Sequence, residues 1–291
     1  MTILVLGSAG NLGTAISEYA ANKEEIKIIG WDKAEIDARD QALLSKKILE
    51  LAPQVIINTV AFNDVDGCET SEESRNMAKT LNVDLVRSLA LVAIEAKATL
   101  VHLSSDYVFK GDDAQGYTEE AQADPLNIYG QTKLDGEKEL ISASGKGLQW
   151  YLIRTSKLFG PKGTSVGAKP SFFELMFRLS KKNSSLKVVT DEIGSFTYTR
   201  DLAAAIMKLL EEEQAFGIYH LINSGETSWY GAAEYFFKTL HKDIILEAVN
   251  SESFPRPAAR PKHSLLLNTK RPVLRSWQEA VQDYCTQEKF I

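Results

Sequence analysis

In the first half of the chain, short apolar runs alternate with longer segments of helical spacing. The apolar runs lie at residues 3–6, 26–29, 55–57, 100–103 and 150–153. The helical segments lie at 12–21, 41–51, 72–96 and 127–144. The runs lack apolar–polar alternation, as expected of strands that crossover helices bury on both faces. This pattern predicts an α/β fold built on a doubly wound parallel sheet of the Rossmann type.

After residue 156 the pattern changes. The segment GPKGTSVGAKP at 160–170 is rich in glycine and proline, which indicates a loop and a change of domain. Beyond it we expect a strand at 218–221, an extended loop at 254–262, and helices at 171–181, 199–213, 229–240 and 272–288. Residues 1–156 are expected to form a dinucleotide-binding domain. Residues 157–291 are expected to form mainly a smaller α+β substrate domain, with segments after about 186 able to return to the first domain.

The composition excludes several classes of protein. With 33 Lys and Arg against 39 Asp and Glu, the formal net charge is −6, and no block of basic residues marks a nucleic-acid-binding surface. No apolar stretch approaches the roughly 18 residues that span a bilayer, and the N-terminus does not resemble a signal peptide. The cysteines, Cys68 and Cys285, form no metal or redox motif. We expect a cytoplasmic protein with a small-molecule partner and no nucleic-acid or membrane partner.

Three glycines, Gly7, Gly10 and Gly13, follow the first predicted strand directly. Glycine permits a tight turn there and lets backbone N–H groups approach a pyrophosphate at the helix N-terminus. An ordinary glycine turn is the alternative explanation of this spacing by itself. Asp32 follows the second predicted strand about 20 residues later, where a carboxylate can accept from a ribose hydroxyl. Together the two features predict a dinucleotide site.

Tyr129 and Lys133 lie four residues apart on the helix predicted at 127–144, so both side chains share one face. An ammonium near a tyrosine is expected to stabilise the phenolate and to lower the pKa of the tyrosine toward neutrality. The spacing alone does not identify a site, because Tyr19 and Lys23 have it too.

The strand before Tyr129 distinguishes the two pairs. It ends in Ser104, Ser105 and Asp106, and the carboxyl edge of a doubly wound sheet is where ligands bind. A serine hydroxyl there would bind a carbonyl oxygen while Tyr129 protonates it. Turn capping is the alternative role of the serines.

Several segments resemble the extended short-chain dehydrogenase/reductases, most closely the dTDP-4-dehydrorhamnose reductase family. They are GSAGNLG at 7–13, LSSDYVF at 103–109, PLNIYGQTK at 125–133, RTS at 154–156, GSFTYTRDLA at 194–203 and RPKHS at 260–264. The resemblance runs nearly from end to end. It implies reduction of the C4 ketone of a nucleotide-linked 4-keto-6-deoxy sugar, as from dTDP-4-dehydrorhamnose to dTDP-rhamnose, by hydride transfer from NADPH or NADH.

The resemblance also implies roles for single residues. The catalytic residues would be Ser105, Tyr129 and Lys133. Besides Tyr129 and Lys133, the cofactor would contact Gly7, Ser8, Ala9, Gly10, Asn11, Leu12, Gly13, Asp32, Asp37, Ala61 and Asn82. The sugar nucleotide would contact Ser105, Asp106, Tyr107, Lys157 and Arg260.

The chain departs from the family pattern at three places. Lys157 stands where the family usually carries an aromatic residue, Ala61-Phe-Asn-Asp-Val-Asp66 replaces Ala-x-Thr-x-Val-Asp, and Leu267 replaces an acidic residue. Lys157 would pair with an anionic group of a different ligand or face water at the rim, and we expect the latter.

Other functions stay open on the sequence. The fold also resembles the regulatory subunit of methionine adenosyltransferase, which binds the cofactor without catalysis, and a sugar-nucleotide epimerase is a further alternative. Dehydration is disfavoured because Tyr107 replaces the second carboxylate of the Asp-Glu pair that dehydratases use. Asp32 favours an unphosphorylated ribose, whereas the adjacent Lys33 would meet a 2′-phosphate, so NADPH and NADH both remain candidates. A homodimer is compatible with the sequence, and no metal site is expected.

Overall fold

The computed structural model describes residues 1–21, 23–165 and 169–290. Its centre is a six-stranded sheet in the order β10-β5-β4-β3-β1-β2, in which every neighbouring pair is parallel. The strands are β1 (Thr2–Leu6), β2 (Lys27–Trp31), β3 (Val55–Asn58), β4 (Thr99–Ser105), β5 (Gln149–Thr155) and β10 (Gly217–His220). The predicted doubly wound parallel sheet is therefore confirmed.

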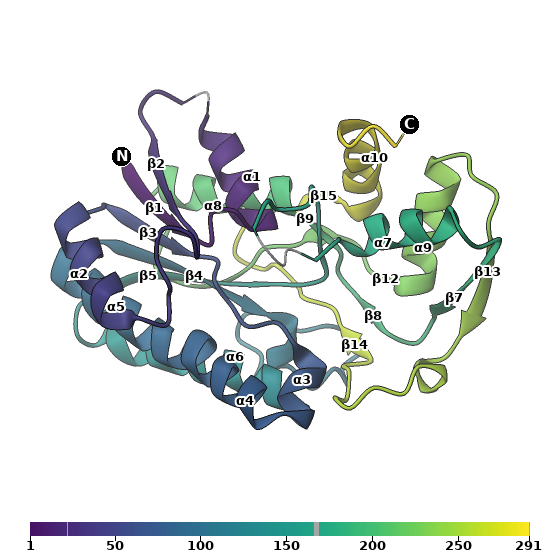
Figure 1. Ribbon diagram of the computed structural model, residues 1–291, viewed down its shortest axis with the longest axis horizontal. Coiled ribbons are helices and arrows are strands. Elements are labelled where there is room, and N and C mark those ends of the chain that lie inside the picture. The colour runs from purple at the N-terminus through teal and green to yellow at the C-terminus, as the bar shows by residue number, and fades with distance from the viewer. Residues whose placement is uncertain (22, 166–168, 291) are drawn as a thin grey trace.

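Helices cover both faces of this sheet (Figure 1). On one face lie α1 (Asn11–Ala20) and α8 (Thr199–Glu211), and on the other lie α2 (Gln41–Leu51), α5 (Leu85–Ala96) and α6 (Ile128–Ser144). Alternate strand residues enter the two cores: Ile3 and Val5 pack with α1 and α8, whereas Leu4 and Leu6 pack with the opposite layer. Because both faces are buried, the strands read as continuous apolar runs.

A second, smaller region lies beside the carboxyl end of the sheet and has its own aromatic core. It contains α7 (Phe172–Ser180), α9 (Trp229–Thr239) and α10 (Trp277–Gln287), with the parallel pair β7 (Ser185–Val189) and β13 (Ile245–Val249). Its short strands are β6 (Leu158–Phe159), β8 (Ile193–Gly194), β9 (Thr197–Tyr198), β11 (Asn223–Ser224), β12 (Thr227–Ser228), β14 (His263–Ser264) and β15 (Leu274–Ser276). Fully buried rings fill this core: Phe159, Phe173, Phe196, Tyr198, Phe236 and Tyr284.

The helical segment expected at 72–96 is confirmed in its bounds, and it contains a π-helical turn. The chain forms α3 (Val65–Thr70), α4 (Glu72–Lys79), a π-helical segment (Thr80–Asp84) and then α5. Ser71 separates α3 from α4 because its backbone is extended and its hydroxyl caps Ser74. A π-helical segment often accompanies a functional site, and this one carries the buried Asn82.

The last helix begins later than expected. Residues 274–276 form β15, and α10 starts at Trp277 because Ser276 and Glu279 form a capping box. The pair β7 and β13 was not expected, since β13 is largely exposed and its residues carry no clear alternation. Among the described residues, no helix is long and apolar enough to cross a membrane.

Candidate active site and cofactor cleft

The turn after β1 is built for a close approach of backbone to a ligand. Gly7 has φ 77°, in the region that favours glycine, and its carbonyl accepts from Gly10 N at 3.0 Å. A Cβ on Gly13 would lie 2.3 Å from the Gly7 oxygen and 2.6 Å from Ser8 Cα. Among the described residues, no side chain caps the first turn of α1, as an anion-binding helix N-terminus requires.

Asp32 holds the other side of this turn. Its carboxylate accepts from Ala9 N at 3.1 Å and from Lys33 N at 2.6 Å. Both Asp32 and Asp37 line a largely apolar cavity of about 260 Å³ beside Gly7. The Arg39 guanidinium forms an ion pair with Asp37, and this hydrogen bonding lowers the pKa of that carboxyl to about 2. The cavity wall thus offers a carboxylate at the end of β2, where a cofactor ribose is expected.

Asn82, expected near the cofactor, has its side chain hydrogen-bonded to protein groups, and its contact with the cofactor stays a prediction. Asn82 is completely buried, its Oδ1 accepts from Phe62 N at 2.9 Å, and its Nδ2 donates to Phe62 O and to Thr132 Oγ1. The side chain therefore anchors the loop after β3 to helix α6.

Ser105, Tyr129 and Lys133 meet at the carboxyl end of β4. Tyr129 lies in the first turn of α6, which Asn127 caps through Gly130 N at 2.7 Å. The Tyr129 hydroxyl donates to Asn63 Oδ1 at 3.1 Å, and Lys133 Nζ donates to Leu103 O at 2.7 Å. A tyrosine, a serine and an ammonium are thus gathered within one turn of helix and one strand end.

The ionisation of Tyr129 differs from the sequence-based expectation. Burial, followed by the charge of Asp106 and the nearby Tyr107, raises the pKa of Tyr129 well above its usual range, and a hydrogen bond with Ser105 only partly opposes this. The expected lowering by Lys133 is wrong for this structure, because burial and the charge of Asp106 dominate the shift. The phenol stays protonated at neutral pH, as a proton donor requires.

The surroundings of Lys133 shift its pKa toward neutrality. Burial lowers the pKa of Lys133 to about 8, while the negative charge of Glu137 acts to raise it. Glu137 lies one turn further along α6 and is almost completely buried. Arg154 of β5 binds it with two hydrogen bonds, at 3.0 and 2.7 Å, and Ser104 donates to the same carboxylate. The residue type and its spacing from Lys133 could have suggested this role from sequence.

Asp106 lies behind Ser105 rather than in the open cleft. It is almost completely buried, and it accepts from Ser105 Oγ at 3.0 Å and from Ser156 Oγ at 2.8 Å. Tyr107 packs edge-on against Tyr129, with ring centroids 5.5 Å apart. Asp106 therefore orients the serine, and Tyr107 supports the tyrosine ring, while their contact with the substrate stays a prediction.

Lys157 does not face water at the rim, so that expectation is wrong. Its ammonium lies over the rings of Trp229 and Phe196, 5.2 and 5.5 Å from their centroids. Burial lowers the pKa of Lys157 to about 8, against the charges of Asp106 and Glu192. The backbone has φ 39°, and no hydrogen bond to this ammonium occurs within residues 1–21, 23–165 and 169–290.

Gly194 leaves the room that the Lys157 ammonium occupies. A Cβ on Gly194 would lie 2.7 Å from Lys157 Nζ and 2.8 Å from Ser264 Oγ. The ammonium therefore lies between the space beside Gly194 and the aromatic rings of Phe196 and Trp229, and its N–H donors stay free for a ligand.

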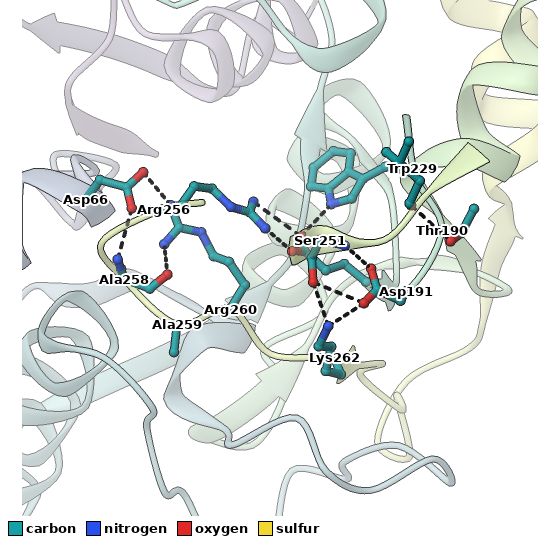
Figure 2. A network of polar contacts seen from close by, with 12 residues as sticks. Asp66, Thr190, Asp191, Trp229, Ser251, Arg256, Ala258, Ala259, Arg260 and Lys262 are labelled. Atoms are coloured by element: carbon teal, nitrogen blue, oxygen red, sulfur yellow. Dashed lines mark hydrogen bonds and ion pairs between the residues drawn. The ribbon is translucent and has the colours of Figure 1, made fainter. Parts of the chain in front are cut away.

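The loop at 250–262 ties the smaller region to the sheet domain (Figure 2). Asp66 of α3 accepts from Arg260 Nη2 at 2.8 Å and from Ala258 N at 3.2 Å. Further along the loop, Arg256 pairs with Glu192, which also accepts from Trp229 Nε1 at 3.1 Å. Arg260 thus joins this loop to α3 through its ion pair with Asp66, and its contact with the substrate stays a prediction.

The sheet order, the glycine turn and the serine, tyrosine and lysine set define a short-chain dehydrogenase/reductase. The family model described as the RmlD substrate binding domain matches residues 1–290. The spore coat polysaccharide biosynthesis protein SpsK of Bacillus subtilis (strain 168) is 33% identical over 288 residues, covering 97% of this chain and 96% of that protein. The dTDP-4-dehydrorhamnose reductase of Escherichia coli (strain K12) is 32% identical over 300 residues, covering 97% and 96%.

A solved structure agrees with these relatives. The dTDP-4-dehydrorhamnose reductase of Bacillus anthracis, in complex with NADP, is 32% identical and superposes with a TM-score of 0.89 over 98% of this chain and 99% of that one. The chain belongs to the RmlD family, whose members include the dTDP-4-dehydrorhamnose reductases.

Gly13→Ala should abolish or strongly weaken NADPH binding, because the new Cβ collides with backbone atoms that cannot move without opening the turn. Gly145→Ala, at the end of α6, meets nothing within 4 Å and is the matched control. Titration of nicotinamide fluorescence measures both affinities. Equal affinity in the two variants would contradict this assignment of the turn.

Proposed function

We propose that the chain reduces the C4 ketone of a nucleotide-linked 4-keto-6-deoxy sugar with NADPH or NADH. The observation that carries the proposal is the assembly of Ser105, Tyr129 and Lys133 at the carboxyl end of the sheet. The relatives named dTDP-4-dehydrorhamnose reductase, one of them solved with NADP, support this substrate class and cofactor.

Each residue of the set has a distinct role in this proposal. Tyr129 donates its proton to the carbonyl oxygen, and Ser105 holds that oxygen by a hydrogen bond. Lys133 provides a positive charge beside the site and a donor for the nicotinamide ribose. When bound, the reduced nicotinamide supplies the hydride. The glycine turn, Asp32 and Asp37 hold the dinucleotide along the ends of β1 and β2.

We further propose that residues 1–156 and 157–291 act as dinucleotide-binding and substrate domains. Their separate cores support this division, and α8 and β10 return to the first sheet. A cytoplasmic location is part of the proposal, since Cys68 and Cys285 are both unpaired thiols. A homodimer stays a prediction.

Lys157 is proposed as a substrate contact on the wall of the cleft. An aromatic residue at this position would present an apolar face, whereas an ammonium with free N–H groups favours an oxygen-bearing face of the sugar. The negative charges of Asp106 and Glu192 already act on this ammonium and raise its pKa. A neutral hydroxyl therefore suits Lys157 better than a further carboxylate, which both acids would repel.

Tyr129→Phe should lower kcat by about a hundredfold to ten-thousandfold, because the general acid is lost. The matched control is Tyr19→Phe, since Tyr19 and Lys23 have the same spacing and are in contact at 3.0 Å, on α1 and the turn that follows it. The measurement is loss of nicotinamide absorbance with dTDP-4-dehydrorhamnose. Cofactor binding without any turnover in the wild type would instead favour the non-catalytic regulatory subunit.

Glu137→Gln should move the alkaline loss of kcat to lower pH. The negative charge of Glu137 raises the pKa of Lys133, so its removal lets the ammonium deprotonate below pH 8. Glu139→Gln, on the same helix but paired with Arg87 at the surface, should leave the profile in place. Profiles of kcat at saturating substrate, on variants shown to be folded by circular dichroism, decide between the two outcomes.

Lys157→Met should raise KM for the keto-sugar nucleotide about 10-fold or more and change kcat less, because a charged hydrogen-bond donor to the sugar is lost. In the wild type the same KM should rise as pH passes about 8, where Lys157 loses its proton. Lys187→Met, at an exposed position of β7, is the control. An unchanged KM in Lys157→Met would remove Lys157 from the substrate contacts.

A further inference from the structure

The loop between β3 and α3 places one amide against the Tyr129 hydroxyl. Asn63 Oδ1 accepts from that hydroxyl at 3.1 Å. Tyr129 is buried, whereas Asn63 is exposed. In the part of the chain that the structure describes, Asn63 Nδ2 has no hydrogen-bond partner, so this donor is free.

The position of Asn63 is fixed from both sides. Asn82 binds the backbone N–H and carbonyl of Phe62, the preceding residue, and also donates to Thr132 Oγ1 at 3.0 Å. Thr132 in turn donates to Tyr129 O at 2.8 Å. On the other side, Asp64 caps α3 through Gly67 N at 3.2 Å. The loop with Asn63 and the helix turn with Tyr129 therefore form one connected unit.

Proton transfer leaves a negative charge on the Tyr129 oxygen, which a hydrogen-bond donor in this loop would stabilise. As the carbonyl carbon gains a hydride with its electron pair, the π electrons move to oxygen, which takes the Tyr129 proton and leaves a phenolate. Burial and the charge of Asp106 disfavour that phenolate. Lys133 donates to Leu103 O, so a second donor near the phenolate oxygen lowers the cost of the step.

We propose that Asn63 is a positioning residue for Tyr129, holding the phenol through Oδ1 and, after the amide turns, stabilising the phenolate through Nδ2. The inference rests on the proposed reductase activity and assigns a role to one of the chain's departures from the family pattern. The family usually carries threonine at this position, and a hydroxyl can also both accept and donate.

Four variants test this role. Asn63→Ala should lower kcat about 10- to 100-fold, as expected for loss of a hydrogen bond to a charged group, with little change in NADPH affinity. Asn63→Thr should restore most of that loss. Asn63→Asp should be as slow as Asn63→Ala, because its carboxylate cannot donate, and should recover as the pH falls toward the usual carboxyl pKa of about 4. Asn76→Ala, at an exposed position of α4, is the control.

A second measurement does not depend on turnover. In protein with tyrosine isotope-labelled at Cζ, the resonance missing from Tyr129→Phe identifies Tyr129. Its chemical shift should change in Asn63→Ala and not in Asn76→Ala. If the wild type lacks activity but the shift changes, the proposed reaction fails while the contact stands. Wild-type kcat in Asn63→Ala, equal losses in the Thr and Ala variants, or an unchanged shift would overturn the role of Asn63.

Discussion

The ion pair between Glu137 and Arg154 fixes the geometry on which the site depends. Both residues are almost completely buried, and two hydrogen bonds join helix α6 to strand β5, with Ser104 of β4 as a third partner. Removing one member of such a pair strands a charge in the interior, whereas the intact pair tolerates few other arrangements. The helix that carries Tyr129 and Lys133 is therefore held to the strand that carries Ser105 at one register and one distance.

The same interior explains how the site handles charge. Lys133 and Lys157 approach the cleft from different regions of the chain, and burial brings the pKa of each to about 8. Neither ammonium forms an ion pair among the described residues. Glu137 acts on Lys133 through space, and Asp106 and Glu192 act on Lys157. Buried ammonium groups of this kind interact strongly with an incoming oxygen, because water screens them little.

Much of the fold follows from sequence because its signals are local. Apolar runs define the parallel strands, and the glycine turn and Tyr129–Lys133 spacing lie next to the strands that position them. What escaped prediction depends on long-range contacts. The contact of the buried Asn82 with Thr132 and the ion pair of Asp66 with Arg260 join residues far apart in sequence. Lys157 was misjudged because its aromatic surroundings come from Phe196 and Trp229, which no local pattern connects to it.

Positions 194 and 157 share one space beside the site. The missing side chain of Gly194 is the space in which the Lys157 ammonium lies, and β14 closes the other side through Ser264. A side chain at position 194 would therefore displace the Lys157 ammonium, which the flexible lysine stem allows. The size of the residue at position 194 and the place of the Lys157 ammonium are thus linked, so a change at either position alters the space left at the other.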